Sequence, residues 1–188
     1  TIQYAATDKQ VKGILLKVSG SPNGWATQQQ LRKALYDFKA KGKFVVAYAE
    51  SITQKSYYLA NVSNKGFLNP AGSFELKGMA SQIPFFKGTL DMLEVKPEIF
   101  YAGKFKSATE PFREQQMSEP NKIQIREYQN DLWADFITQV AAKTGTDTET
   151  VHQWATAGSV QFPNDALQYK LVDGLLYWDE VEQYMRTL

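Results

Sequence analysis

The sequence predicts an α/β domain in which repeated βαβ units surround a parallel sheet. Short apolar runs alternate with helical segments along the chain, which is typical of right-handed βαβ units. The length of 188 residues suits one such domain with a sizeable core. Because no internal repeat, linker or low-complexity stretch interrupts the chain, we predict a single domain over residues 1–188.

The first part of the chain predicts two buried strands. Residues 13–18 and 44–49 are nearly continuous apolar runs, as in parallel strands that are covered on both faces. A helix between them has a capping box of Thr27 and Gln30 and ends at Gly42. A short helix at 54–64 and a short strand at 67–68 follow.

The second part predicts more helix than strand. We expect strands at 73–77 and 99–102, and helices at 84–93, 118–143, 147–155 and from Asp179 onward. The helix at 118–143 carries an apolar stripe and has Gly145 where a C-cap belongs. The stripe consists of Ile125, Tyr128, Leu132, Phe136 and Val140.

Composition limits the chemistry. The net charge of +1 provides no global field for nucleic acid, so we expect no nucleic-acid partner. Cysteine is absent, which excludes disulfides and thiolate chemistry, and the one histidine, His152, has a sequence context that favours a surface or packing role. We expect no metal and no cofactor.

The chain opens with Thr1 and contains no apolar run of roughly 20 residues, so we interpret it as a domain excised from a longer protein.

Common catalytic motifs are missing from the sequence. It contains no G-x-G-x-x-G, G-x-x-x-x-G-K-[ST], H-E-x-x-H or G-x-S-x-G pattern, and no serine is followed three residues later by lysine. The acidic residues are scattered, and no pair of them stands out as a general acid and base.

Residues 101–112 are the most informative segment. They follow an expected strand and lead toward a helix, where α/β folds place reactive groups. If residues 104–106 are extended, Lys104 and Lys106 point to one face. Like charge and burial both favour a neutral amine, which a lysine needs in order to act as a base. Lysines in loops are usually solvated, however, and two lysines also make a small basic patch for a phosphate, so the residues alone leave these roles open.

The pattern Gly103-x-x-Lys106-Ser107-Ala108, followed by Glu110-Pro111-Phe112, is the most specific part of a wider resemblance. Further matching segments are 11–17, 31–35, 42–43, 56–60, 69–72, 78–80 and 171–173. Together they cover nearly the whole chain. It resembles the N-terminal half of the long form of signal peptide peptidase A, also called protease IV. The resemblance implies a Clp protease/crotonase-like fold, with residues 1–188 as one half-domain of a peptidase.

The resemblance also implies roles for single residues. The general-base lysine of the family falls on Lys106, and Lys104 matches a variable position. The nucleophilic serine of the family lies in the C-terminal half, in a Ser-Gly-Gly-Tyr type segment; here the aligned residues read Gln54-Lys55-Ser56-Tyr57. An amide therefore replaces the nucleophile, and Ser56 falls two residues out of register. The glycine-rich oxyanion loop falls on residues 20–24, which lack paired glycines.

The implied function is a Ser/Lys peptidase that is divided between two halves. This chain would donate Lys106, and a C-terminal half would donate the serine. The implied substrates are cleaved signal peptides and other short apolar peptides. The implied assembly is a tetramer-like dome of identical subunits on the outer, periplasmic face of the bacterial cytoplasmic membrane, anchored by a helix outside this chain.

Two alternatives remain. A non-catalytic scaffold domain could retain the peptidase fold, and in that case Lys106→Ala would not change turnover. A crotonase-like enzyme acting on acyl-thioesters would need an oxyanion pair and a pocket for coenzyme A. The sequence offers no clear candidate for either.

Overall fold

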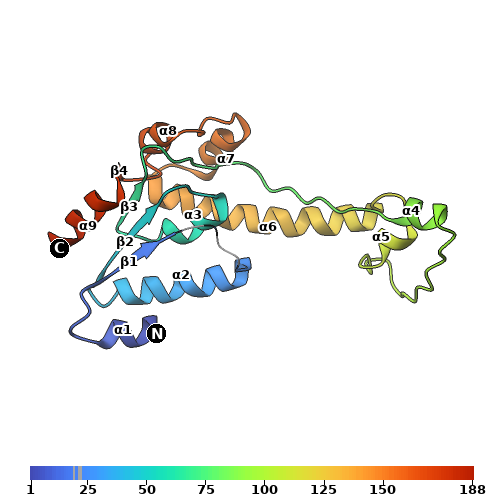
Figure 1. Ribbon diagram of the computed structural model, residues 1–188, viewed down its shortest axis with the longest axis horizontal. Coiled ribbons are helices and arrows are strands. Elements are labelled where there is room, and N and C mark those ends of the chain that lie inside the picture. The colour runs from blue at the N-terminus through green and yellow to red at the C-terminus, as the bar shows by residue number, and fades with distance from the viewer. Residues whose placement is uncertain (19, 21–22) are drawn as a thin grey trace. The chain divides into compact units, whose positions relative to one another are not determined.

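The computed structural model describes residues 1–18, 20 and 23–188 (Figure 1). The chain forms two compact units. Unit 1 comprises Thr1–Gly78 and Asp135–Leu188, and unit 2 comprises Met79–Ala134. That both units belong to one domain stays a prediction.

Unit 1 is built on a parallel sheet that has, within the described residues, the strand order β1-β2-β3-β4. The strands are β1 (Gly13–Lys17), β2 (Phe44–Ala49), β3 (Lys65–Leu68) and β4 (Gly174–Leu175). Their register pairs Leu15 with Val46 and Tyr48 with Phe67. The predicted parallel sheet is confirmed, and β4 is a strand that the sequence did not reveal.

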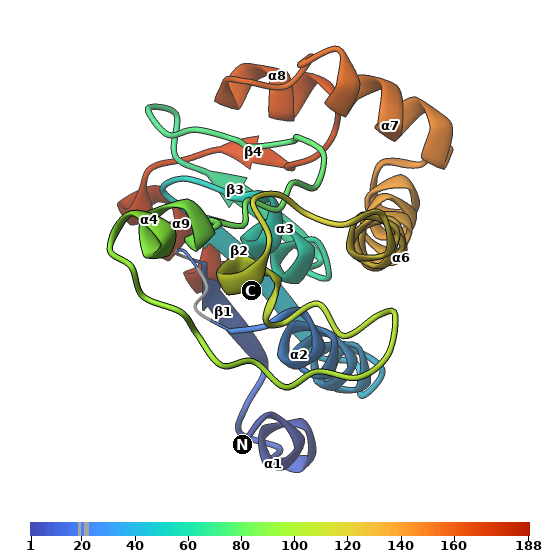
Figure 2. The same cartoon turned by 90° about the vertical axis from the view of Figure 1, so that its right-hand side faces the viewer.

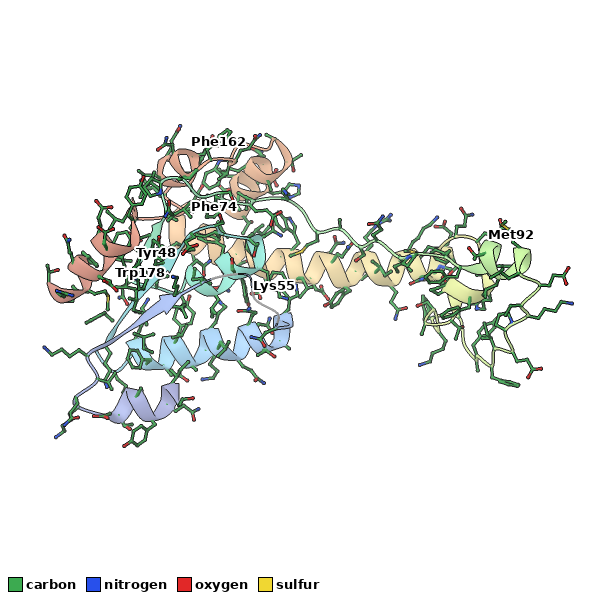
Figure 3. All side chains as sticks on the ribbon, viewed as in Figure 1. Tyr48, Lys55, Phe74, Met92, Phe162 and Trp178 are labelled. Carbon is green, nitrogen blue, oxygen red and sulfur yellow. The ribbon has the colours of Figure 1, made fainter. Side chains whose placement is uncertain are left out.

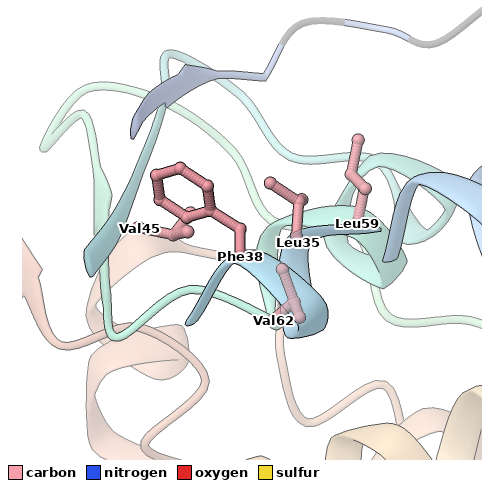
Figure 4. Close-up of a cluster of buried hydrophobic side chains, with 5 residues drawn as sticks. All are labelled: Leu35, Phe38, Val45, Leu59 and Val62. Atoms are coloured by element: carbon pink, nitrogen blue, oxygen red, sulfur yellow. The ribbon is translucent and has the colours of Figure 1, made fainter. Parts of the chain in front are cut away.

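One face of the sheet is covered by α2 (Trp25–Lys39) and α3 (Gln54–Ala60), as Figures 1 and 2 show. Side chains alternate along a strand, and Val45 of β2 points to this face. Leu35, Phe38, Leu59 and Val62 bury Val45 in an apolar cluster (Figure 4). The helix α1 (Ile2–Thr7) packs against the same cluster. Full burial of a large apolar side chain stabilises a fold by about 1.5–3 kcal/mol, so this cluster contributes substantially to the stability of the layer.

The opposite face is covered by α9 (Trp178–Arg186). Val46 and Tyr48 of β2 point to this side and form a cluster with Phe67 and Val181. The Trp178 ring packs against the Tyr48 ring with centroids 5.2 Å apart (Figure 3). β2 is therefore covered on both faces, as its continuous apolar run predicts.

The helix α6 (Glu119–Thr144) begins in unit 2 and ends in unit 1. In unit 1 its residues Phe136 and Val140 are fully buried. Gly145 follows with φ of +74°, and its N–H donates to the Ala141 carbonyl at 2.9 Å, which confirms the predicted C-cap. The helices α7 (Thr148–Thr156) and α8 (Pro163–Gln168) come next. The predicted α6, α7 and α9 are confirmed within one or two residues at each end, whereas α1 and α8 were not predicted.

Unit 2 contains α4 (Lys87–Met92), α5 (Glu110–Arg113) and the first part of α6. The Phe86 and Phe112 rings stack with centroids 5.9 Å apart, and the Phe86 N–H donates to the Pro111 carbonyl at 2.7 Å. Many large apolar side chains of this unit are nevertheless exposed: Phe86, Met92, Leu93, Val95, Phe100, Tyr101, Phe105, Phe112, Ile123 and Tyr128. Met92 can be seen in Figure 3. Unit 2 thus presents an apolar surface that its own described residues leave uncovered.

Three sequence predictions of local structure are wrong. Residues 99–102 are not a strand, and Phe100 is 93% exposed, because no strand among the described residues pairs with this apolar run. Residues 73–77 form only a bridge, in which Phe74 pairs with Ile52. The capping box of Thr27 and Gln30 is also wrong, because α2 begins at Trp25 with Gly24 as its N-cap.

Among the helices of the described residues, none combines the length and the apolar character that a membrane span requires.

Candidate functional site

Lys106 closes a tight turn in unit 2. Its backbone N–H donates to the Gly103 carbonyl at 3.2 Å, and Gly103 has φ of +97°. This left-handed conformation strains any residue with a side chain, so the turn explains the glycine of the Gly103-x-x-Lys106 pattern. The condition considered in the sequence, that residues 104–106 are extended, is not met, because Lys104 and Phe105 occupy the centre of the turn.

The Lys106 side chain lines an open hollow of about 490 Å³. Phe100, Tyr101 and Phe105 contribute aromatic walls. Lys104 and Lys106 are both exposed to solvent, but only Lys106 belongs to this wall. The structure therefore places Lys106 at the edge of a hollow, with its side chain exposed and not buried.

A second hollow of about 500 Å³ lies beside the first and shares Ser107, Ala108 and Gln124 with it. Its remaining wall is largely apolar and includes Ile83, Pro111 and Tyr128. The small side chains after Lys106 thus separate two apolar hollows within unit 2. This surface suits an apolar partner or an apolar peptide.

Glu110, four residues after Lys106, is almost fully buried, with 2% of its surface exposed. Its Oε1 atom accepts a hydrogen bond from the Ser118 hydroxyl at 2.5 Å. Its Oε2 atom accepts from the Asn121 amide at 2.8 Å and from the Ser118 backbone N–H at 3.2 Å. Burial raises the pKa of Glu110, but these hydrogen bonds and the nearby Arg113 guanidinium together hold the pKa below its ordinary value. Glu110 belongs to the matching pattern, but the sequence alone predicted no role for it.

Gln54 lies where the resemblance places the nucleophile. It is the first residue of α3 and is buried, and its Oε1 atom accepts a hydrogen bond from the Lys77 backbone N–H at 2.8 Å. Gln54 is therefore a structural residue in this chain. It joins the start of α3 to the segment that follows Phe74.

Ser56 is engaged in the N-cap of α3. Its hydroxyl accepts from the Thr53 N–H and donates to the Thr53 carbonyl, both at 2.9 Å, and the Thr53 side chain accepts from the Ser56 N–H at 3.2 Å. The residue is fully buried. These contacts agree with the interpretation that Ser56 does not replace the missing nucleophile.

The carboxyl end of β2 opens on a hollow of about 530 Å³ in unit 1. Its walls come from residues 51–53 and 73–77 and from the end of α7 with the turn that follows it. Ligands of α/β sheets commonly bind outside the carboxyl ends of the strands. The loop expected to resemble an oxyanion site, residues 20–24, includes Ser21 and Pro22, which lie outside the described residues.

Asp173 of the Leu171-Val172-Asp173 pattern has a structural role. Its carboxylate accepts from the Gly66 N–H at 2.8 Å and pairs with Lys143 and Lys65, each at 3.2 Å. Burial raises the pKa of Asp173, but the Gly66 hydrogen bond and the two lysines lower it more, so the pKa lies below its ordinary value. Asp173 thus joins β3 to the end of α6.

A buried arginine, Arg32 on α2, was not identified from the sequence. Its guanidinium donates to the Gln139 side chain at 2.7 Å, to the Tyr36 hydroxyl at 3.2 Å, to the Asn61 side chain and to the Tyr58 carbonyl. Burial lowers the pKa of Arg32 below its ordinary value. This network joins α2, α3 and the end of α6 in unit 1, and it lies apart in sequence from the segment around Lys106.

His152 is exposed on α7, which fits the first of the two roles, surface or packing, that its sequence context favours. Within residues 1–18, 20 and 23–188, no group of three or more histidine, cysteine, aspartate or glutamate side chains is arranged to hold a metal ion.

Solved structures with similar folds define the fold class. A peptidase from Plasmodium falciparum aligns with a TM-score of 0.54 at 17% identity, over 94% of this chain and 85% of that one. An enoyl-CoA hydratase/isomerase from Marinobacter aquaeolei aligns with a TM-score of 0.52 at 11% identity, over 99% of this chain and 61% of that one. At these identities the likeness shows the fold alone. It confirms the predicted α/β, Clp protease/crotonase-like fold.

Sequence comparisons then give the family. A sequence model of peptidase family S49 matches residues 37–188. Protease 4 of Salmonella typhi is 33% identical over 192 residues, which cover 97% of this chain and 31% of that protein. The chloroplastic serine protease SPPA of Arabidopsis thaliana is 27% identical over 177 residues, which cover 94% of this chain and 26% of that protein. The chain belongs to peptidase family S49, and it spans less than a third of the length of these two relatives.

Proposed function

We propose that this chain supplies the general base, Lys106, to a Ser/Lys peptidase whose nucleophilic serine lies outside residues 1–188. The observation that carries the proposal is the position of Lys106. The residue lines the aromatic hollow, and its amine makes no hydrogen bond or ion pair with the described residues, so it is available to a group from elsewhere. Gln54 supports the proposal, because an amide bonded to the Lys77 N–H leaves this chain without a nucleophile at the matching position.

The proposed reaction begins with a neutral Lys106 amine. It accepts the Oγ proton as the serine attacks the peptide carbonyl, and the ammonium then donates that proton to the leaving amine as the C–N bond breaks. An acyl-enzyme ester results. Lys106 next accepts a proton from water, whose oxygen attacks the ester; the acid leaves and the serine regains its proton. Backbone N–H groups near the serine stabilise the oxyanion in both steps.

The two hollows beside Lys106 support a substrate with apolar side chains. Their walls carry Phe100, Tyr101, Phe105, Ile83 and Tyr128, which favour apolar side chains. Cleaved signal peptides and other short apolar peptides have this character, and we propose them as the substrates.

The partners and the location are part of the same proposal. The exposed apolar surface of unit 2 supports a C-terminal, serine-bearing half of the same protein as its partner, since large apolar surfaces mark interaction sites. We also propose a homo-oligomer at the outer face of the bacterial cytoplasmic membrane, held by an anchor outside this chain. Covering the surface around Lys106 would also provide the partial dehydration that a lysine base requires.

Replacing Lys104 and Lys106 one at a time in the complete protein tests whether Lys106 is the general base. Lys106→Ala should abolish hydrolysis of an apolar peptide, because general-base catalysis contributes about 10²–10⁴-fold. Lys104→Ala is the matched control, since Lys104 is also exposed in the same turn but lies outside the hollow. Equal activity of both variants and the unchanged protein would contradict the proposal.

A second candidate function is a non-catalytic scaffold domain. The exposure of Lys106 and the apolar surface of unit 2 favour it, because an assembly surface needs no base. The same experiment separates the two functions, since a scaffold predicts unchanged turnover for Lys106→Ala. The acyl-thioester alternative gains no support from the likeness to an enoyl-CoA hydratase/isomerase, which extends to the fold alone.

A further inference from the structure

The turn that carries Lys106 is attached to the start of α6 through a buried carboxylate. Glu110 begins α5, and its N–H donates to the Ser107 carbonyl at 2.9 Å, so the carboxylate follows the turn closely along the chain. Its acceptor oxygens bind Ser118 and Asn121. The Ser118 hydroxyl in turn accepts from the Asn121 N–H at 3.3 Å, as an N-cap residue does. The buried negative charge also lies at the positive end of the α6 dipole.

Arg113 connects both sides of the turn. Its guanidinium lies over the Tyr101 ring, 4.0 Å from the centroid, just before the turn. It also lies 3.6 Å from Glu110 Oε1 and donates to the Thr109 hydroxyl at 3.4 Å, just after the turn. Tyr101 and Glu110 therefore hold the two ends of the segment that contains Lys106. Glu110 is buried, whereas Tyr101 and the residues of the Gly103–Lys106 turn are exposed.

We propose that Glu110 is the positioning residue for Lys106: by binding Ser118, Asn121 and Arg113, its buried carboxylate fixes where the lysine turn presents its amine. The inference rests on the proposed function of Lys106. Glu110 itself touches neither substrate nor serine. It acts by fixing the path of the backbone that leads out of the Gly103–Lys106 turn.

The physical reason lies in how few contacts hold this turn. Lys106 is exposed, and its backbone is held by one hydrogen bond to Gly103. Without the Glu110 carboxylate, the Ser118 and Asn121 donors lose their acceptor and the segment loses its attachment to α6. Displacement of a catalytic group by about 1 Å costs a rate on the order of 100-fold. In the complete protein, a loosened turn would also hold the lysine less firmly under the partner that covers it, and an amine left in water favours its charged form.

The test compares variants of the complete protein in peptide hydrolysis as a function of pH. Glu110→Gln keeps the shape and removes the charge. We expect kcat to fall on the order of 100-fold with KM little changed, and the acid limb of the kcat/KM profile to move to higher pH. Glu110→Asp, which keeps the charge, should recover part of kcat and of the profile. A purely structural role would reduce the amount of active protein and leave the profile where it is.

Glu119→Gln is the matched control. Glu119 also carries a negative charge at the start of α6, the helix end that Glu110 contacts. Glu119 is exposed, however, and pairs with Lys122 alone among the described residues. Its substitution should change neither kcat nor the profile. In the 188-residue chain, hydrogen exchange gives a second measurement that needs no serine: the Lys106 and Glu110 amides should exchange faster in Glu110→Gln and not in Glu119→Gln.

The outcomes separate this inference from the proposed function. If Lys106→Ala retains turnover, the proposed function fails and this inference fails with it. If Lys106→Ala is inactive while Glu110→Gln matches Glu119→Gln in kcat, pH profile and exchange, then Lys106 remains the base and Glu110 does not position it. Circular dichroism establishes that each variant is folded. If Glu110→Gln is unfolded, Glu110→Asp and Ser118→Ala take its place in the comparison with Glu119→Gln. Ser118→Ala removes one hydrogen-bond donor to Glu110. An unchanged pH profile in both of these variants would overturn the inference.

Discussion

The side-chain oxygen of Gln54 accepts a hydrogen bond from the Lys77 backbone N–H at 2.8 Å, at the position where the resemblance places a nucleophile. The buried amide therefore stabilises the segment that pairs with Ile52. A serine at this position is too short to make the same contact. The bond thus gives a structural role to the residue at this position.

Gln54→Ala should lower the free energy of unfolding by about 1–2 kcal/mol, because the Lys77 N–H loses its acceptor. Urea denaturation of the chain measures this change. Gln153→Ala, at an exposed position of α7, should stay within about 0.5 kcal/mol of the unchanged chain. Equal stability of the two variants would contradict a structural role for Gln54.

Arg32→Met should lower the free energy of unfolding by about 3 kcal/mol. The variant leaves the Gln139 and Asn61 side-chain acceptors and the Tyr58 carbonyl without their donor. Thermal and urea unfolding provide the measurement. Lys33→Met on the same helix removes an exposed cation and should change stability by less than about 1 kcal/mol. A similar small loss for Arg32→Met would show that the network contributes little.

Asp173 should make the free energy of unfolding depend on pH in the acid range. Its folded pKa lies below the ordinary carboxyl value of about 3.9, so its contribution is complete above that pH and is lost as pH falls through the folded pKa. The difference in unfolding free energy between the unchanged chain and Asp173→Asn should therefore shrink between about pH 5 and pH 2. Melting temperatures across this range test the prediction, and a constant difference would contradict it.

Gly103→Ala should loosen the lysine turn, because φ of +97° strains a residue with a side chain by about 1–2 kcal/mol. The space itself is open, since an added Cβ lies 3.7 Å from the nearest side-chain atom. Hydrogen exchange at the Lys106 amide should therefore accelerate. Gly78→Ala, in open space and without a positive φ, is the control and should leave that exchange unchanged.

The sequence predicted those elements whose signal is local. The apolar runs at 13–18 and 44–49 gave β1 and β2, because a parallel strand buried on both faces needs such a run. The run at 99–102 looks the same and yet forms no strand, since a strand also needs a neighbour that the sequence does not specify. The two-residue β4 is too short to leave a pattern.

The candidate site divides in the same way. The matching pattern directed attention to Lys106 and Gln54, and their proposed roles stay predictions. The Glu110 network could not be predicted, because Ser118 and Asn121 become partners only when the chain folds back onto the start of α6. Arg32 gave no signal either: an arginine on an amphipathic helix is ordinarily exposed, and its burial depends on Asn61 and Gln139 from distant segments.

The most direct measurement is to label the complete protein with a fluorophosphonate, which reacts with an activated serine, and to locate the label by mass spectrometry. We predict one labelled serine outside residues 1–188, with labelling lost in Lys106→Ala and retained in Lys104→Ala. A label on a serine within this chain, or labelling that persists in Lys106→Ala, would contradict the role of Lys106 as the donated base.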